Sequence, residues 1–197
     1  MNENNWAIAT SADVVGILGS PRRGGNSQVL LESALKGAAD RGLSVATIIL
    51  NDLKLSPCQN CGYCDKMGEC RIKDDMVGMS QVMETAPRII VSAPIYFTNL
   101  SAQTKIMIDR CQPYWARRFV LNQPLKGPKR AGAFISVGGF KQADAFFECA
   151  KRAITAWFSV IGVRYRAGKF YSGVDAKGDA ERHPTAVDDC YQLGAEL

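Results

Sequence analysis

Three observations predict an α/β protein built on a five-stranded parallel sheet. Short, continuously apolar segments alternate with amphipathic segments along the chain, as in repeated βαβ units. Most apolar segments are followed by a loop rich in glycine, proline or cysteine. The 197 residues are 47% hydrophobic and 22% charged, which is typical of a single globular domain. Because crossovers between parallel strands are right-handed, five strands favour the doubly wound order 2-1-3-4-5.

The predicted strands span residues 13–19, 43–50, 88–93, 130–137 and 162–170. The first reads as a strand buried on both faces. The third is expected to stop at Pro94, because proline cannot donate to a sheet ladder. Residues 1–12 are expected to form an irregular N-terminal arm. Residues 13–197 then make one domain.

Helices are predicted where apolar residues recur every three to four positions. They run from an N-cap at Asn26-Ser27 to Gly42, from Asp74-Asp75 to about Thr85, from about Ser101, from about Gln142 to Ile161, and briefly after His183-Pro184. The carboxyl ends of parallel strands share one edge of a sheet, where ligands bind in this architecture. The unusual loops of this chain follow strands one to four, so we expect them to meet in one crevice.

The cysteine-rich loop, residues 57–73, holds four of the seven cysteines at the spacing C-x2-C-x2-C-x5-C: Cys58, Cys61, Cys64 and Cys70. Thiolates two residues apart can converge on one centre, and this run suits a cubane iron–sulfur cluster. A structural zinc site more often joins two separate C-x2-C pairs by a longer loop. Free thiols and local disulfides are further alternatives.

The three remaining cysteines are isolated, and none is given a role: Cys111, Cys149 and Cys190. Cys149 falls in a predicted helix and is expected to be a small buried hydrophobe. The chain shows no secretory signal and no apolar run that could span a membrane. We therefore expect a cytoplasmic protein whose cysteines are reduced, with no membrane partner.

The loop at residues 19–27, between the first strand and first helix, predicts an anion site. Small residues let backbone amides approach the anion, and the helix N-terminus adds its positive end. A P-loop needs lysine where Gly25 stands, and no dinucleotide fingerprint G-x-G-x-x-G is present. The loop thus suits a single monoester phosphate, and a plain glycine-rich turn is the alternative. The side chains expected to contribute are Ser20, Arg22, Asn26 and Ser27.

Two further loops could complete a pocket. Residues 93–99, after the third strand, are apolar and aromatic and offer a flat surface to a heteroaromatic ring. An ordinary hydrophobic loop is the alternative there. Gly138-Gly139, after the fourth strand, offers another close backbone approach.

These motifs together resemble the NADPH-dependent FMN reductase superfamily. The resemblance rests on Gly-Ser-Pro-Arg-x-Gly-Gly-Asn-Ser, on Ala-Pro-Ile-Tyr-Phe followed by Ser-Ala-Gln-x-Lys, on Asp109-Arg110 and on Gly138-Gly139. It covers roughly residues 13–170, and the cysteine loop ahead of Asp74 resembles the iron–sulfur flavoprotein branch. It implies a flavodoxin-like three-layer sandwich, tightly bound FMN, and homodimers or homotetramers. It also implies that the four loop cysteines are the ligands of a 4Fe–4S cluster. NADPH as electron donor follows from this resemblance alone. The residues expected to bind the cofactor are Ser20, Arg22, Asn26, Ser27, Gln28, Pro94, Ile95, Tyr96, Phe97, Asn99, Gly138 and Gly139.

The function expected is an FMN-dependent oxidoreductase that passes electrons between its flavin and a 4Fe–4S cluster, with a ferredoxin-like protein or a small quinone or flavin as partner. The alternatives are an NAD(P)H-dependent FMN or quinone reductase lacking a cluster, and a non-enzymatic flavin electron carrier. No catalytic side chain is expected, because the flavin performs the chemistry. The single histidine, His183, lies far from every motif.

The net charge of the chain is +5, but the basic residues are scattered, which gives no reason to expect nucleic acid binding. Residues 113–119, aromatic and basic, are expected to cover the flavin, to recognise an acceptor or to form a subunit interface.

Overall fold

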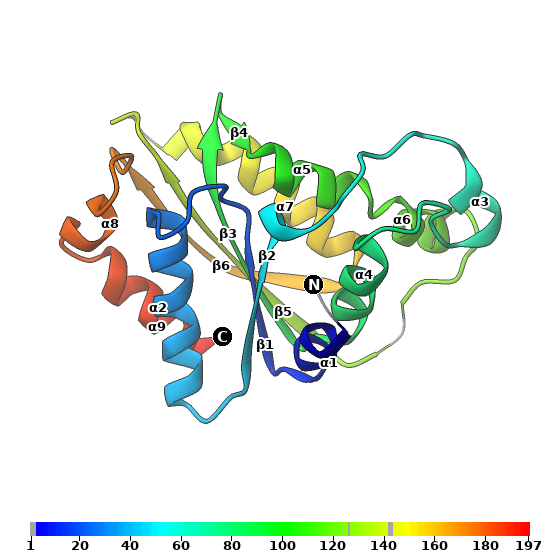
Figure 1. Cartoon of the computed structure of the whole chain (residues 1–197), viewed down its shortest axis with the longest axis horizontal. Helices are drawn as coiled ribbons and strands as arrows, with labels where there is room; N and C mark the ends of the chain where they lie inside the picture. Colours follow the sequence, from blue (N-terminus) through cyan, green and yellow to red (C-terminus); the bar gives the residue numbers. More distant parts are fainter. Residues whose placement is uncertain (1–2, 126, 142–143) are drawn as a thin grey trace.

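Five parallel strands form the central sheet in the spatial order β2-β1-β3-β5-β6 (Figure 1). The structure is a computed structural model that describes residues 3–125, 127–141 and 144–197. The parallel strands are β1 (Val14–Leu18), β2 (Val45–Ile49), β3 (Arg88–Tyr96), β5 (Arg130–Gly138) and β6 (Val163–Ser172). A two-residue strand, β4 (Asn99–Leu100), pairs antiparallel with the end of β3. Counted along the chain, the parallel strands have the predicted order 2-1-3-4-5, which is confirmed.

Helices cover both faces of the sheet, so the flavodoxin-like three-layer sandwich is confirmed (Figure 1). One face carries α2 (Asn26–Asp40), α8 (Asp179–Arg182) and α9 (Ala186–Glu196). The other carries α1 (Glu3–Ser11), α4 (Met76–Thr85), α5 (Ala102–Asp109) and α7 (Glu148–Val160). All five residues of β1 are buried and point alternately into the two cores, which explains its continuously apolar sequence. No helix of the described residues is long and apolar enough to cross a membrane.

Two glycines bring α2 and α9 into backbone contact. A Cβ atom added at Gly194 would lie 1.7 Å from the carbonyl oxygen of Ala34, and one at Gly37 would lie 2.0 Å from that of Tyr191. Real Cβ atoms never approach so closely, so only glycine fits either position. The close crossing fastens the C-terminal helix to the helix that begins at the predicted anion loop.

The prediction that Pro94 ends its strand is wrong, because β3 continues to Tyr96. The carbonyl of Ser92 accepts a hydrogen bond of 2.8 Å from the Gly19 amide on the β1 side. Pro94 lies two residues later and faces the same side, where β1 has already ended at Leu18. The proline therefore removes no ladder hydrogen bond, and it still pairs in register with Val137 of β5.

The helices differ from prediction in three places. Residues 3–11 form α1 instead of an irregular arm, and the Trp6 ring lies against α4, 2.5 Å from where a Gly78 side chain would begin. The helix predicted from about Gln142 starts at Glu148, after a 3-10 turn (η2, Asp144–Phe147), and residues 142–143 lie outside the described residues. Unpredicted short elements include the 3-10 turn η1 (Leu50–Asp52), α3 (Tyr63–Met67), α6 (Gln112–Phe119), α8 and β4.

Candidate functional sites

A hollow at the carboxyl edge of the sheet brings the three predicted loops together. It encloses about 520 Å³, including solvent at its mouth. Nine of the twelve residues predicted to bind a cofactor line it: Ser20, Arg22, Asn26, Ser27, Pro94, Ile95, Tyr96, Gly138 and Gly139. The loop after β6 adds Val174, Asp175 and Lys177, which sequence reasoning missed because no motif marks them. We call this cavity the carboxyl-edge hollow.

The N-terminus of α2 opens into this hollow. The N-cap is Gly25, one residue before the predicted Asn26-Ser27 cap, and no side chain caps the helix. The first helical amides are thereby left for a ligand, and the positive end of the helix dipole faces the same space. Gly25 is held tightly, since a Cβ there would lie 3.1 Å from the Cβ of Arg22. An oxyanion fits this arrangement.

Three cationic side chains surround the loop. Arg22 donates to the carbonyl of Asp175 at 3.0 Å and forms a 3.3 Å ion pair with its carboxylate. Arg23 pairs with Asp52. The Lys177 ammonium lies 3.2 Å from where a Gly24 side chain would begin, and the positive φ of Gly24, 60°, favours glycine there. Arg22 and Asp175 are largely exposed, so an anion can replace this carboxylate beside Arg22 at little cost.

Asn26 links α2 to the loop after β6. Its side-chain amide donates to the carbonyl of Ala176 at 3.0 Å, and its oxygen accepts from the Ala180 amide at 3.2 Å. The side chain therefore fixes the loop after β6 against α2 and positions Lys177 indirectly. The Ser20 hydroxyl accepts from the Arg22 amide at 3.2 Å, which shapes the loop.

Three predicted cofactor residues do not line the carboxyl-edge hollow. Gln28 accepts from the Gly24 amide at 2.8 Å and donates to Glu32 at 2.7 Å. Asn99 caps its own turn by accepting from the Leu100 amide at 2.8 Å. Phe97 is fully exposed, and its φ of 49° is rare for a bulky residue.

Gly138, one of the two glycines predicted to bind the cofactor, allows the Phe146 side chain to pack against the end of β5. A Cβ at Gly138 would lie 2.5 Å from the Phe146 ring, so the glycine makes room for that side chain. A Cβ at Gly139 would lie 3.1 Å from the Cβ of Asp175. The two glycines thus allow η2 and the loop after β6 to close on the end of β5.

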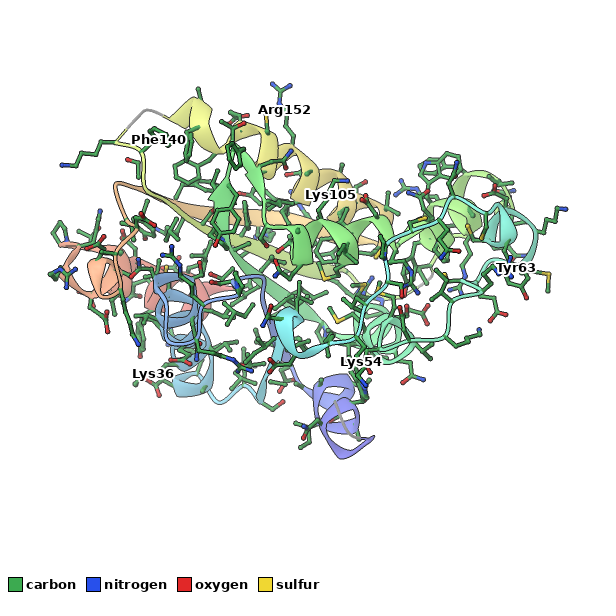
Figure 2. All side chains as sticks on the ribbon, turned by 45° about the horizontal axis from the view of Figure 1, so that its top comes forward. Lys36, Lys54, Tyr63, Lys105, Phe140 and Arg152 are labelled. Atoms are coloured by element: carbon green, nitrogen blue, oxygen red, sulfur yellow. The ribbon has the colours of Figure 1, made fainter. Side chains whose placement is uncertain are left out.

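The four loop cysteines line a second cavity of about 610 Å³, which we call the cysteine hollow: Cys58, Cys61, Cys64 and Cys70. All four are free thiols. The short helix α3 carries Cys64 and is bounded by Gly62 and Gly68, both in the left-handed conformation that favours glycine. Burial first, and then the Asp65 carboxylate, raise the pKa of the Cys64 thiol. Figure 2 shows Tyr63 of this hollow and Phe140, next to Gly139, at opposite ends of the molecule.

Helix α6, the aromatic and basic segment, packs beside the cysteine hollow. Trp115 lines that hollow, and Arg117 donates from Nε to the carbonyl of Gly68 at 2.6 Å. The segment lies by α3, and none of its residues lines the carboxyl-edge hollow (Figure 1).

A buried ion pair supports the cysteine loop. Arg110 binds Asp74 through two nitrogens, at 2.6 and 3.0 Å, and its side chain is inaccessible to solvent. Asp74 also accepts from the amides of Ser56 and Met76 at 2.9 and 3.1 Å. Burial raises the pKa of Asp74, but hydrogen bonds led by Arg110 more than offset this and hold it below its usual value. For Arg110 the directions are reversed: burial lowers the pKa of the guanidinium, but Asp74 and Cys70 raise it above its ordinary value.

The isolated cysteines divide into two kinds. Cys111 and Cys190 are buried, and burial raises the pKa of each thiol to about 12. Cys111 accepts a 3.1 Å hydrogen bond from Nε1 of Trp157. Cys149 is exposed, so the prediction that it is a buried hydrophobe is wrong, and the buried residues of α7 are Ala150, Ile154, Trp157 and Phe158.

A sequence model of the NADPH-dependent FMN reductase family matches residues 12–165. The chain belongs to this family. It is therefore an FMN-dependent oxidoreductase. It is 40% identical over 150 residues to an iron–sulfur flavoprotein of Archaeoglobus fulgidus, covering 76% of this chain and 73% of the relative. An iron–sulfur flavoprotein of Methanosarcina thermophila is 33% identical over 150 residues, covering 76% and 74%.

Solved structures agree on the fold of this family member. The NAD(P)H:quinone oxidoreductase from Methanothermobacter marburgensis superposes with a TM-score of 0.72 at 16% identity, covering 95% of this chain and 96% of that one. A flavodoxin from the domain Archaea gives a TM-score of 0.54 at 12% identity, covering 93% and 94%. At such identities the likeness concerns the fold alone.

The residues of the carboxyl-edge hollow fit FMN. Uncapped amides of α2, Arg22 and Lys177 suit a phosphate, and the apolar wall of Pro94, Ile95 and Val137 suits a ring. Its one lining carboxylate, Asp175, already pairs with Arg22.

The cysteine hollow fits an iron–sulfur cluster by the chemistry of its donors. Four thiols line one cavity, which is the donor set of a four-iron cluster. Among the described residues, no three histidine, cysteine or acidic side chains converge closely enough for a single metal ion. A cluster is wider than one ion, so its ligands surround it at greater separation.

Proposed function

We propose that this chain passes electrons between FMN in the carboxyl-edge hollow and a 4Fe–4S cluster held by Cys58, Cys61, Cys64 and Cys70. The observation that carries this proposal is that all four cysteines are free and line one cavity. The names of the iron–sulfur flavoproteins of Archaeoglobus and Methanosarcina support it.

In this proposal, the chain's own residues bind and orient. Bound FMN would supply exchange between two-electron and one-electron transfer, and a cluster would accept single electrons. Arg22, Lys177 and the α2 amides hold the phosphate. The end of β3, Pro94 to Tyr96, presents backbone groups and an apolar surface to the ring. No side-chain acid or base is required, and His183 is at the C-cap of α8, outside the residues that line either hollow.

Partners and location follow the same proposal. We propose NAD(P)H as the donor, a ferredoxin-like protein or a quinone as the acceptor, and a homodimer or homotetramer as the assembly. The reduced state that the four thiols need favours a cytoplasmic location.

The test is an absorption spectrum of protein purified without oxygen, with iron and sulfide assays on the same sample. We expect flavin bands, a broad shoulder near 400 nm, and about four irons per chain. Cys61→Ser should lose iron and keep FMN, because the two hollows share no lining residue. Cys149→Ser is the matched control, since it also removes an exposed thiol but outside the loop. Equal iron in the two variants would contradict the assignment.

A second candidate is an NAD(P)H-dependent FMN or quinone reductase without a cluster. The specific observation in its favour is the match of residues 12–165 to the NADPH-dependent FMN reductase family, whose name states flavin reduction and mentions no cluster. Flavin without iron in the anaerobic sample, together with quinone turnover, would establish this candidate instead.

A further inference from the structure

Arg110 ties the two ends of the cysteine loop together. One terminal nitrogen donates to the carbonyl of Ser56 at 2.8 Å, and the other donates to the carbonyl of Ile72 at 3.2 Å. These carbonyls lie directly before and after residues 57–71. The arginine follows the last residue of α5, so the loop is fastened to a helix that packs on the sheet.

The third nitrogen of Arg110 has no partner. Its Nε is the buried side-chain polar atom left without a hydrogen bond among the described residues. Arg110 is 2% exposed, and leaving a buried N–H unsatisfied costs about 1–3 kcal/mol. Asp74 cannot supply the missing acceptor, because both of its oxygens already accept from Arg110 and from the backbone.

The position of Arg110 indicates which acceptor is missing. The residue lines the cysteine hollow together with all four loop thiols. Arg117 approaches the same loop through its own Nε, but that atom is satisfied by the Gly68 carbonyl. Arg110 therefore brings an unused charged donor beside a cavity that the four thiols line together with other polar side chains, among them Asp65, Gln59 and Asn60. Thiolates and sulfides are acceptors for such a donor.

We propose that Arg110 is a positioning residue for the cluster, and that its Nε–H donates to a sulfur of the Cys70 thiolate or of the cluster itself. This rests on the proposed function. Reduction adds one electron to the cluster, and a cationic donor stabilises the more negative state. Arg110 thereby raises the reduction potential of the cluster while it holds the loop closed.

The test compares three variants in the iron-loaded protein by anaerobic redox titration. Arg110→Lys keeps the charge but has no Nε donor, so its reduced-to-oxidised ratio at fixed potential should fall about tenfold, which is 59 mV for one electron. Asp74→Asn keeps Nε and removes a nearby negative charge, so its potential should rise. Arg117→Lys, the matched control, should match the parent protein. FMN content and melting temperature verify folding.

These outcomes separate the inference from its premise. No iron in the parent protein overturns both proposals. If the parent protein holds iron but Arg110→Lys leaves the reduction potential unchanged, only the proposed role of Arg110 is overturned. The same conclusion holds if Arg110→Lys and Asp74→Asn lower the potential equally, because Arg110 then acts only by holding the loop closed. If Arg110→Lys does not take up iron, the contact is tested instead by pulsed EPR of the reduced parent protein labelled with ¹⁵N-arginine. Magnetic coupling between the cluster and an arginine nitrogen supports the contact of Arg110 with the cluster, and its absence refutes that contact.

Discussion

Asp175→Asn is expected to tighten FMN binding. The Asp175 carboxylate lies 3.3 Å from the Arg22 guanidinium, within the lining of the carboxyl-edge hollow. A phosphate there must displace this carboxylate and then remain beside its negative charge. The amide keeps the shape of the side chain and removes both penalties.

The size of the expected gain in FMN affinity follows from the solvent exposure of the Arg22–Asp175 pair. Arg22 and Asp175 have 61% and 73% of their side-chain surfaces accessible, so solvent screens the pair strongly. An exposed pair contributes about 0.2–1 kcal/mol, which predicts FMN binding about 1.4- to 5-fold tighter. Because these charges are exposed, the gain should vanish near 1 M salt, where the Debye length is about 3 Å.

The assay is titration of flavin-free protein with FMN, followed by quenching of flavin fluorescence at low and high salt. Asp188→Asn, an exposed change of the same net charge outside the hollow, is the control. In an Arg22→Ala background, Asp175→Asn should have less effect, because part of its benefit acts through the freed guanidinium. Unchanged or weaker binding by Asp175→Asn at low salt would refute the assignment of this hollow to the phosphate.

Other predictions concern packing, thiol reactivity and pH. Gly194→Ala forces α9 away from α2, at about 1–3 kcal/mol for overpacking, and should lower the melting temperature by about 2–12 °C in a calorimetric scan. A smaller change would show that the helices separate freely. At about pH 8, iodoacetamide should label Cys149 in the native protein and spare Cys111 and Cys190, whose burial raises the pKa of each thiol to about 12; mass spectrometry of the peptides checks this. The pKa of Asp74 is lowered in the folded protein, so its contribution to stability is complete above the pKa of an aspartate in the unfolded chain, about 3.9, and is lost as the pH falls through the lower folded pKa. Urea unfolding of Asp74→Asn should thus show a flatter pH dependence below that value, and identical slopes would contradict the pairing.

The sequence predicted the sheet well because its signal is local. The inner strands β1, β3 and β5 are apolar runs with both faces buried, as the five buried residues of β1 show. Pro94 misled because its acceptability depends on where β1 ends, a fact of the neighbouring strand. The N-terminal helix was missed for the same reason. A single aromatic residue in a polar segment does not show that the Trp6 ring packs against Gly78 of a distant helix.

The candidate site was predictable in part for a similar reason. Loops after strand ends carry recognisable motifs, and nine of the residues predicted from them share one hollow. Asp175 and Lys177 were missed because they reach the hollow from a loop without a motif. Gln28 lies outside the hollow, where the Gly24 amide before α2 and the Glu32 carboxylate within α2 satisfy its side chain.

The fastening of Ser56 and Ile72 by one arginine has a consequence for variation in the cysteine loop. The two ends of the cysteine loop already lie side by side, held to α5 from within the fold. The segment between them can lengthen, shorten or change its ligands without moving a strand of the sheet. This one junction thus lets the cysteine loop change while the carboxyl-edge hollow keeps its shape.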